Sequence, residues 1–376
     1  MTVAAFMDLA LYDADLGYYA RAAQRSGRAG DFFTSVDVGP LFGELLEIQL
    51  AEMGRLTAEA AEHAERNDRS GLSALSAVRS FDLVEAGAGN GRLSADVLRA
   101  ARDRDPAFYD SLRLHLVETS DEARRAQAET LGGVAERLAS STDSLPATFQ
   151  GVLIANELLD ALPVHQVVMR EDGLREVYVI SDGDPERVAL HLAEGPPSTP
   201  ALAEYLDRLG VTLETGWRVE INLRAVDWIR DAARRLERGF ILLIDYGHEA
   251  RELYSATHAA GTLTTYARHR STGPESAPHT PAWLRQPGEQ DLTAHVDFTS
   301  VRAAAEGEGL TTLGFLDQTY FLLGLLPAIR NPQSAIRNLK TLVMPGGLGS
   351  THKVLMFGKG VGTPALLGCS FRVRVT

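Results

Sequence analysis

The segment Val84–Ser94, VEAGAGNGRLS, constrains the fold of this 376-residue chain more than any other. It places glycine at three alternate positions, between a short apolar run and a run with helical periodicity. Glycine permits a sharp reversal of the backbone there and exposes amide groups at the start of a helix. Such a turn between strand and helix is typical of folds that bind a nucleotide-like ligand at one edge of a parallel sheet.

The alternation of apolar strand and helix continues along the chain beyond this turn. The predicted strands are residues 80–87, 112–120, 137–141, 151–157, 217–223 and 239–247. Buried strands that alternate with helices form right-handed units around a parallel sheet that is covered on both faces. The pattern therefore predicts an α/β fold.

Two stretches depart from this alternation and are predicted to be insertions, at about 164–216 and 249–295. The first begins with two β-rich runs around the turn EDG, which predicts a hairpin. The second is rich in Thr, His, Pro and Gly and is long for a simple connection, which favours a functional segment or a lid. We expect a helical N-terminal segment at 1–57, a main domain at 58–358 and a tail at 359–376.

Composition excludes several classes of partner. The chain has 37 Lys and Arg against 50 Asp and Glu, a formal net charge of −13. This field repels phosphate backbones, so we expect no nucleic acid partner, and a cationic substrate suits it better.

Location and assembly are constrained only weakly. A single cysteine, Cys369, indicates a reducing compartment. The acidic opening of the chain lacks the pattern of a leader, and no apolar run is long enough to span a membrane. We expect a cytoplasmic chain, and a homodimer is one alternative for its oligomeric state.

Spacing within the glycine turn separates the ligand classes. A dinucleotide fingerprint needs its third glycine at position 92, which is Arg92, and no Gly-Lys-Ser/Thr follows as in a phosphate-binding loop. What remains is Glu-x-Gly-x-Gly-x-Gly, which begins at Glu85. A carboxylate beside the glycines suits a cationic ligand better than a pyrophosphate.

A second acid, Glu118, ends the next predicted strand, where an acid can accept hydrogen bonds from ribose hydroxyls. Alternatives stay open for both features. The glycines could form a tight turn without a ligand, and Glu118 could be a solvated strand end.

Asn156 and Glu157 end the strand at 151–157, and Asp160 follows three residues later. If this segment is helical, the three-residue spacing puts the two carboxylates on one face, where they could act together on a ligand. The alternative is that one acid caps the next helix.

Two weaker clusters lie further along the chain. IDYGH contains Asp245, Tyr246 and His248, and DLTAHVDF contains Asp291, His295 and Asp297. The second has a spacing seen among metal ligands, but no other compact motif of such ligands accompanies it, so we expect no metal. Pocket lining or hydrogen bonding is favoured for these side chains.

Together with VEAGAGNGRL, several stretches resemble the MidA-like family of S-adenosylmethionine-dependent methyltransferases, relatives of the mitochondrial complex I assembly factor that methylates an arginine. They are LALYDADLGYY, GDFFTS, LFGELL, IANELLDALPVHQ, LIDYGH, GTLTTY and PGEQDLTAHVDFTS. The resemblance covers the chain from about Phe6 to Gly358. The C-terminal GVGTPALLGCSFRVRVT does not match.

The resemblance implies a class I methyltransferase fold. This is a Rossmann-like, mostly parallel seven-stranded sheet with helices on both faces, and HKVLMFG at 352–358 would supply its antiparallel strand. The resemblance also implies S-adenosyl-L-methionine as cofactor. The residues expected to bind it are Gly30, Asp31, Glu85, Gly87, Gly89, Gly91, Glu118, Asp143 and Asn156.

Individual roles follow from the same resemblance. Glu85 would hold the ammonium end, Glu118 the ribose and Asp143 the adenine amino group, although Asp143 could instead cap its own turn. Gly30 and Asp31, in the GDFFT loop, would close the pocket, unless Phe32 and Phe33 merely plug a surface loop.

The activity implied is methylation of an exposed arginine in a partner protein, in respiratory-complex assembly, with Glu157 and Asp160 as a clamp for the guanidinium and His295 beside the acceptor. Two alternatives stay open. The size of the insertions favours a non-catalytic assembly factor or chaperone with a residual cofactor site, and a small-molecule methyltransferase is the other.

Overall fold

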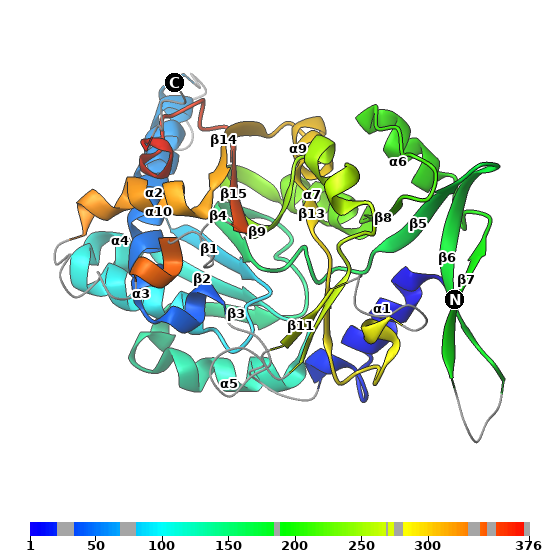
Figure 1. Cartoon of the computed structure of the whole chain (residues 1–376). Coiled ribbons are helices and arrows are strands. Elements are labelled where there is room, and N and C mark those ends of the chain that lie inside the picture. Colours follow the sequence, from blue (N-terminus) through cyan, green and yellow to red (C-terminus); the bar gives the residue numbers. More distant parts are fainter. Residues whose placement is uncertain are drawn as a thin grey trace. The chain divides into compact units, whose positions relative to one another are not determined.

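The computed structural model describes residues 1–20, 34–67, 80–183, 189–267, 270–273, 281–329, 339–343 and 351–371. Contacts between residues divide the chain into two compact units (Figure 1). Unit 1 comprises residues 1–33, 158–229 and 246–304, and unit 2 comprises residues 34–157, 230–245 and 305–376. Both predicted insertions therefore belong to unit 1.

Unit 2 is built on the central sheet, whose strand order is β14-β15-β9-β4-β1-β2-β3. The strands are β1 (Phe81–Ala86), β2 (Leu112–Val117), β3 (Leu138–Thr142), β4 (Phe149–Asn156), β9 (Leu236–His248), β14 (Thr311–Asp317) and β15 (His352–Lys359). The pairs β1–β2, β1–β4, β2–β3 and β4–β9 are parallel. β15 is antiparallel to β14. The predicted mostly parallel sheet and its antiparallel strand are confirmed.

The core of unit 2 lies between this sheet and helices α2 (Leu41–Asn67), α3 (Arg92–Arg104) and α10 (Gln318–Leu325). Apolar residues of α2 recur at helical spacing, and Phe42, Leu45 and Leu46 are fully buried in this core. The boundary expected at residue 57 is wrong because α2 continues through it as one helix packed on the sheet.

Unit 2 contains further helices. They are α4 (Pro106–Ser111), α5 (Asp121–Leu131) and the 3₁₀ helices η2 (Ser35–Val38), η3 (Gly132–Arg137), η7 (Leu326–Ala328) and η8 (Leu367–Cys369). The unmatched C-terminal stretch packs on α2, since the Leu367 and Gly368 amides donate to Glu52 and Gln49.

Unit 1 contains a four-stranded antiparallel sheet of order β7-β6-β5-β8. Its strands are β5 (His165–Arg170), β6 (Gly173–Ser181), β7 (Leu190–Gly195) and β8 (Arg218–Ile221). The hairpin predicted around EDG is β5–β6. The expectation that residues 217–223 join the parallel sheet is wrong, because β8 pairs antiparallel with β5 instead, with Val219 opposite Val167.

The remaining elements of unit 1 are shorter. They are α1 (Val3–Tyr12), η1 (Tyr18–Ala20), α6 (Ala201–Leu209), α8 (Ala250–Leu253), η4 (Ala256–His258), β10 (Thr264–Ala267), β11 (Arg270–Thr272), η6 (Ala282–Leu284), β12 (Asp291–Thr293) and β13 (Val296–Asp297). α1 buries Val3 and Met7 in a core that it shares with β5, β6 and β12. β13 pairs with the end of β9.

Two further helices, α7 (Leu223–Arg235) and α9 (Phe298–Gly307), contribute residues to both units. Among the helices that the structure describes, none is both long and apolar enough to cross a membrane.

Candidate active site

The glycine turn after β1 has a backbone that requires glycine. Gly87, Gly89 and Gly91 have φ values of +70°, +51° and +82°, in the region that other L residues rarely adopt. A Cβ at Gly91 would lie 3.1 Å from Leu116 Cδ1, whereas at Gly89 it would meet nothing within 4 Å. The turn is therefore closed beneath Gly91 and open beside Gly89.

Glu118 follows β2 and is held against this turn. Its Oε2 accepts a hydrogen bond of 2.8 Å from the Gly89 amide, and its Oε1 accepts one of 2.8 Å from the Ser120 amide. Glu118 Oε1 also accepts a hydrogen bond of 3.4 Å from Thr119 Oγ1. Oε2 keeps a further lone pair, so Glu118 can accept a hydrogen bond from a hydroxyl beside the turn.

Gln127, on α5, was not predicted from sequence but supports the same turn. Its Nε2 donates to the Gly89 carbonyl at 2.8 Å, and its Oε1 accepts from Ser141 Oγ at 2.6 Å. Ser141 belongs to β3, so Gln127 joins the glycine turn to the third strand of the parallel series.

Glu85 lies beneath the turn and is only 5% exposed. Its Oε2 accepts hydrogen bonds from the amide and hydroxyl of Ser94, in the first turn of α3. Burial raises the pKa of Glu85 to about 7, and the bonds from Ser94 oppose that shift. Glu85 thus joins β1 to α3, and its contact with a ligand ammonium stays a prediction.

Gly30 and Asp31 lie outside the described residues, but the chain that follows them is fixed near the glycine turn. Asp37 accepts hydrogen bonds from the amide and hydroxyl of Thr34, each at 3.0 Å. It also pairs with Arg92 Nη1 at 2.8 Å, and its side chain is 1% exposed. Arg92, which excluded the dinucleotide spacing, therefore ties the end of the GDFFTS segment to the start of α3.

Asn156 and Glu157 end β4, beside β1, because Ala155 is paired with Ala86. Glu157 has a φ of +51°, one of two positive values among the described residues other than glycine. Such a conformation costs roughly 1–3 kcal/mol and often marks a functional position. Asn156 Oδ1 is buried and accepts no hydrogen bond from the part of the chain that the structure describes.

The Glu157 carboxylate is held from two sides. Asn156 Nδ2 donates to its Oε1 at 3.3 Å, and His352 Nε2 lies 3.5 Å from the same oxygen. His352 begins β15 and its side chain is fully buried. Sequence reasoning missed His352, whose only signal was its position at the start of the predicted final strand.

The premise for pairing Glu157 with Asp160 is wrong. Residues 158–162 form bends and turns rather than a helix, because the left-handed backbone at Glu157 interrupts helical geometry. Glu157 belongs to unit 2 and Asp160 to unit 1. The Asp160 side chain is buried and its carbonyl accepts from the Ala294 amide at 2.9 Å. The clamp formed by these two acids stays a prediction.

Asp143 directly follows β3 and is exposed. The carbonyl of its neighbour Thr142 accepts a 2.8 Å hydrogen bond from the Glu118 amide. Asp143 therefore lies at the same edge of the sheet as the glycine turn, and its contact with an adenine stays a prediction.

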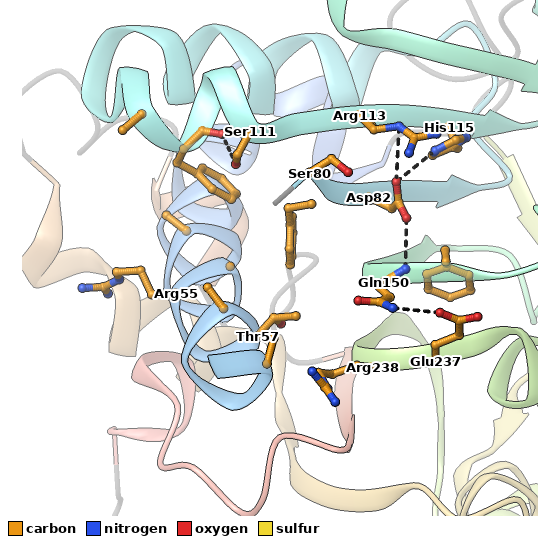
Figure 2. Close-up of a pocket in the computed structure, with 18 of the residues that line it drawn as sticks. Arg55, Thr57, Ser80, Asp82, Ser111, Arg113, His115, Gln150, Glu237 and Arg238 are labelled. Atoms are coloured by element: carbon orange, nitrogen blue, oxygen red, sulfur yellow. Dashed lines mark hydrogen bonds and ion pairs between the residues drawn. The ribbon is translucent and has the colours of Figure 1, made fainter. Parts of the chain in front are cut away.

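A pocket of about 840 Å³ lies at the opposite, amino ends of β1, β2, β4 and β9 (Figure 2). Its polar side chains largely satisfy one another. Asp82 lies 3.3 Å from His115 and 3.7 Å from Arg113, and Gln150 donates to Glu237 at 2.8 Å. Ligands of parallel sheets bind at the carboxyl ends of the strands. Size alone therefore does not make this pocket the active site.

Comparison with known proteins agrees with the geometry at the carboxyl edge. A family described as "Putative S-adenosyl-L-methionine-dependent methyltransferase" matches residues 60–316. The chain belongs to this methyltransferase family.

Relatives of this methyltransferase extend over nearly all of it. A rat protein named protein arginine methyltransferase NDUFAF7, mitochondrial, is 28% identical over 95% of this chain and 76% of its own length. The Drosophila melanogaster homologue is 29% identical over 96% and 82%. A crystal structure from Burkholderia thailandensis bound to S-adenosyl-homocysteine has a TM-score of 0.82 and 29% identity, covering 98% of this chain and 90% of that one.

The residues at the carboxyl edge fit S-adenosyl-L-methionine, the cofactor of this family. The space beside Gly89 is open, Glu118 offers a lone pair for a hydroxyl, and Asn156 Oδ1 is a buried acceptor that needs a donor. The cofactor supplies a methyl group already activated by its sulfonium. The enzyme's task is thus to position the acceptor for in-line attack.

His295, expected beside the acceptor, lies in unit 1 among other histidines. Its ring centroid is 5.2 Å from that of His248 and 5.9 Å from that of His258. Burial, and then the two neighbouring rings, lower the pKa of His295 to about 4. Contact between His295 and an acceptor stays a prediction.

The acids near His295 in sequence have other partners. Asp291 accepts from the Tyr19 hydroxyl at 2.8 Å, and Asp297 accepts from the hydroxyls of Tyr205 and Ser300 at 2.8 and 2.6 Å. These two acids are therefore engaged by tyrosine and serine hydroxyls.

Proposed function

We propose that this methyltransferase transfers the methyl group of S-adenosyl-L-methionine to an arginine side chain of a partner protein. The observation that carries the proposal is Glu157, a carboxylate fixed beside the glycine turn by Asn156 and His352. A guanidinium is a weak nucleophile until its charge is localised and one nitrogen is oriented, and a carboxylate that accepts its N–H bonds does both. The curated relatives named protein arginine methyltransferase support the same acceptor.

The residues near the glycine turn would have separate roles in the reaction. Glu157 accepts hydrogen bonds from the guanidinium. S-adenosyl-L-methionine would supply the methyl group and leave as S-adenosyl-homocysteine, and Glu157 would orient the accepting nitrogen and take up the proton that it loses. His352 and Asn156 act as positioning residues because they hold Glu157 rather than the substrate.

Methyl transfer from donor labelled in the methyl group tests the proposal. The untagged enzyme is incubated with labelled donor and a lysate, and labelled proteins are digested and examined for methylarginine by mass spectrometry. Label on arginine that disappears with Glu157→Gln and persists with the distant control Glu237→Gln supports the proposal. Label confined to small molecules would favour a small-molecule methyltransferase, and partner capture without label would favour a non-catalytic assembly factor or chaperone.

Some finer expectations remain proposals. Respiratory-complex subunits are the first acceptors to test, because of the resemblance to an assembly factor. A cytoplasmic location, a homodimer and the lack of a nucleic acid partner are still predictions, and the curated relatives carry the word mitochondrial in their names.

A further inference from the structure

Three histidines of unit 1 converge from separate segments of the chain. His248 ends β9, His258 ends η4, and His295 lies between β12 and β13. One ring nitrogen from each lies within 4.8 Å of the other two. The ring centroids of His248 and His258 are 4.8 Å apart. Imidazole is the commonest metal-binding side chain, and three of them are the ligand set of many zinc sites.

Hydrogen bonding at His258 favours the tautomer that a metal needs. Its Nδ1 lies 3.0 Å from the carbonyl oxygen of Glu252. A carbonyl can only accept, so Nδ1 carries the proton and Nε2 presents a lone pair. Histidine ligands of metals typically have this second interaction, which fixes the orientation of the ring.

Glu252 also faces His248. Its Oε1 lies 3.0 Å from His248 Nδ1. A carboxylate beside one ring nitrogen favours the proton on that nitrogen and raises the basicity of the other, as in carboxylate–histidine–zinc arrangements. Glu252 therefore lies against two of the three rings, with its carbonyl at hydrogen-bonding distance from His258 Nδ1 and a carboxylate oxygen close to His248 Nδ1.

The ring of His295 has a nitrogen that lacks a hydrogen bond to the residues that the structure describes. Its Nδ1 is buried and makes no hydrogen bond within the described part of the chain. Its backbone is fixed, because the His295 amide donates to Thr262 Oγ1 at 3.1 Å. Buried polar atoms nearly always have a partner, and an orphaned one in a group of imidazoles indicates a bound ligand.

We propose that His248, His258 and His295 bind a divalent transition-metal ion, with Zn²⁺ the best match. Zn–N distances of about 2.0–2.1 Å place tetrahedral ligand nitrogens about 3.3–3.4 Å apart. The nitrogens need to approach one another by about 1.5 Å at most from their 4.8 Å limit. A small shift of η4, a three-residue helix, would contribute to this approach.

The ion would have a structural role in this position. It would tie His258 and His295, near the start and the end of the insertion at 249–295, to the end of β9. Closing a long loop restricts the unfolded chain, so the ion stabilises the native unit. This site is separate in sequence from the glycine turn, and methyl transfer needs no chemistry from the ion.

Zinc binding to the untagged full-length chain tests the proposal. The protein is treated with chelator, freed of it, and dialysed against Zn²⁺, and bound metal is measured by mass spectrometry. One ion per chain and a rise in melting temperature are expected. His258→Ala should weaken binding more than about 100-fold, since loss of a mere supporting contact costs 10–100-fold.

Two variants keep the result interpretable. His191→Ala, an exposed histidine of the same unit, should bind Zn²⁺ as the native chain does. Glu252→Gln keeps all three rings and should weaken binding about 10–100-fold. If the native chain binds no Zn²⁺, or if His258→Ala binds it as tightly as the native chain, the proposal is overturned.

Discussion

The two ends of the parallel sheet of unit 2 differ in how their polar groups are hydrogen-bonded. Pocket volume alone does not show this difference. The amino end has the pocket of about 840 Å³, yet Asp82 and Gln150 have protein partners there. At the carboxyl end, Glu118 and Glu157 are held by specific contacts, while Asn156 Oδ1 accepts no hydrogen bond from the described chain.

This difference shows what marks a binding site in such a fold. The positive φ of Glu157 is unfavourable and is kept only because surrounding contacts hold the backbone there. The space beside Gly89 is open. None of the non-glycine residues described around the amino-end pocket has a positive φ, and its side chains Asp82 and Gln150 have protein partners. We therefore expect substitutions at the carboxyl end to change donor binding and catalysis, and those at the amino end to change neither.

The largest expected effect is that of Gly89→Val. A Val side chain would fill the open space beside the turn at a φ of +51°, so donor binding should fall below detection in equilibrium dialysis. Gly132→Val is the matched control, since Gly132 also has a positive φ, of +55°, and open space around its Cβ position. If both variants lose donor binding equally, the loss reflects general destabilisation of the fold and not a cofactor site at Gly89.

Glu157→Gln should lower kcat about 10²–10³-fold, because the amide cannot localise the guanidinium charge as a carboxylate does. The dissociation constant for the donor should stay within about twofold, since Glu157 faces the acceptor. Single-turnover kinetics at saturating donor separate the two quantities. Unchanged kcat would remove Glu157 from the reaction.

The buried Glu85 makes the stability of the donor-free enzyme depend on pH. Its pKa is raised from 4.5 to about 7, so the folded chain binds a proton that the unfolded chain has lost between these values. Stability therefore falls as pH rises through this window, by up to about 3 kcal/mol. Glu85→Gln, which keeps the acceptor for Ser94, should flatten the dependence in urea unfolding between pH 5 and 8. An unchanged slope would contradict the assignment.

Glu118→Ala should weaken donor binding about 10–100-fold. It removes the carboxylate that we propose as acceptor for the ribose hydroxyls, and a hydrogen bond to a charged group contributes about 1.5–3 kcal/mol. Asp143→Ala, at the exposed end of β3, should have a smaller effect in the same calorimetric titration. Binding that survives Glu118→Ala unchanged would place the ribose elsewhere.

The smallest effect is expected at the amino end. Arg238→Ala alters the wall of the large pocket but touches no group at the glycine turn. Its kcat and donor affinity should stay within about twofold of the native values. A tenfold loss of donor affinity, with unchanged melting temperature, would make the amino-end pocket a binding site and reverse the comparison.

Local features of the sequence sufficed to predict much of the carboxyl end. Glycine at positions 87, 89 and 91 reports backbone conformation directly, and Glu118 was found because acids that end neighbouring parallel strands meet at one edge. The hairpin β5–β6 was likewise predicted from its local pattern, whereas the antiparallel strand β15 was implied by the family resemblance.

Features that depend on distant contacts were not predicted. His352 lies 195 positions from Glu157, and Asp37 lies 55 positions from Arg92, so neither pair has a local signal. The grouping of His248, His258 and His295 was not predicted for the same reason, because no sequence motif surrounds His258. The helical premise for Glu157 and Asp160 failed because residue spacing does not reveal a left-handed backbone.

A crystal structure of this enzyme with S-adenosyl-homocysteine tests the central claim most directly. The account predicts the ribose hydroxyls within hydrogen-bonding distance of Glu118, and the sulfur on the side of the turn that faces Glu157. Ligand density in the pocket lined by Arg55 and Arg238, with none beside Gly89, would contradict it.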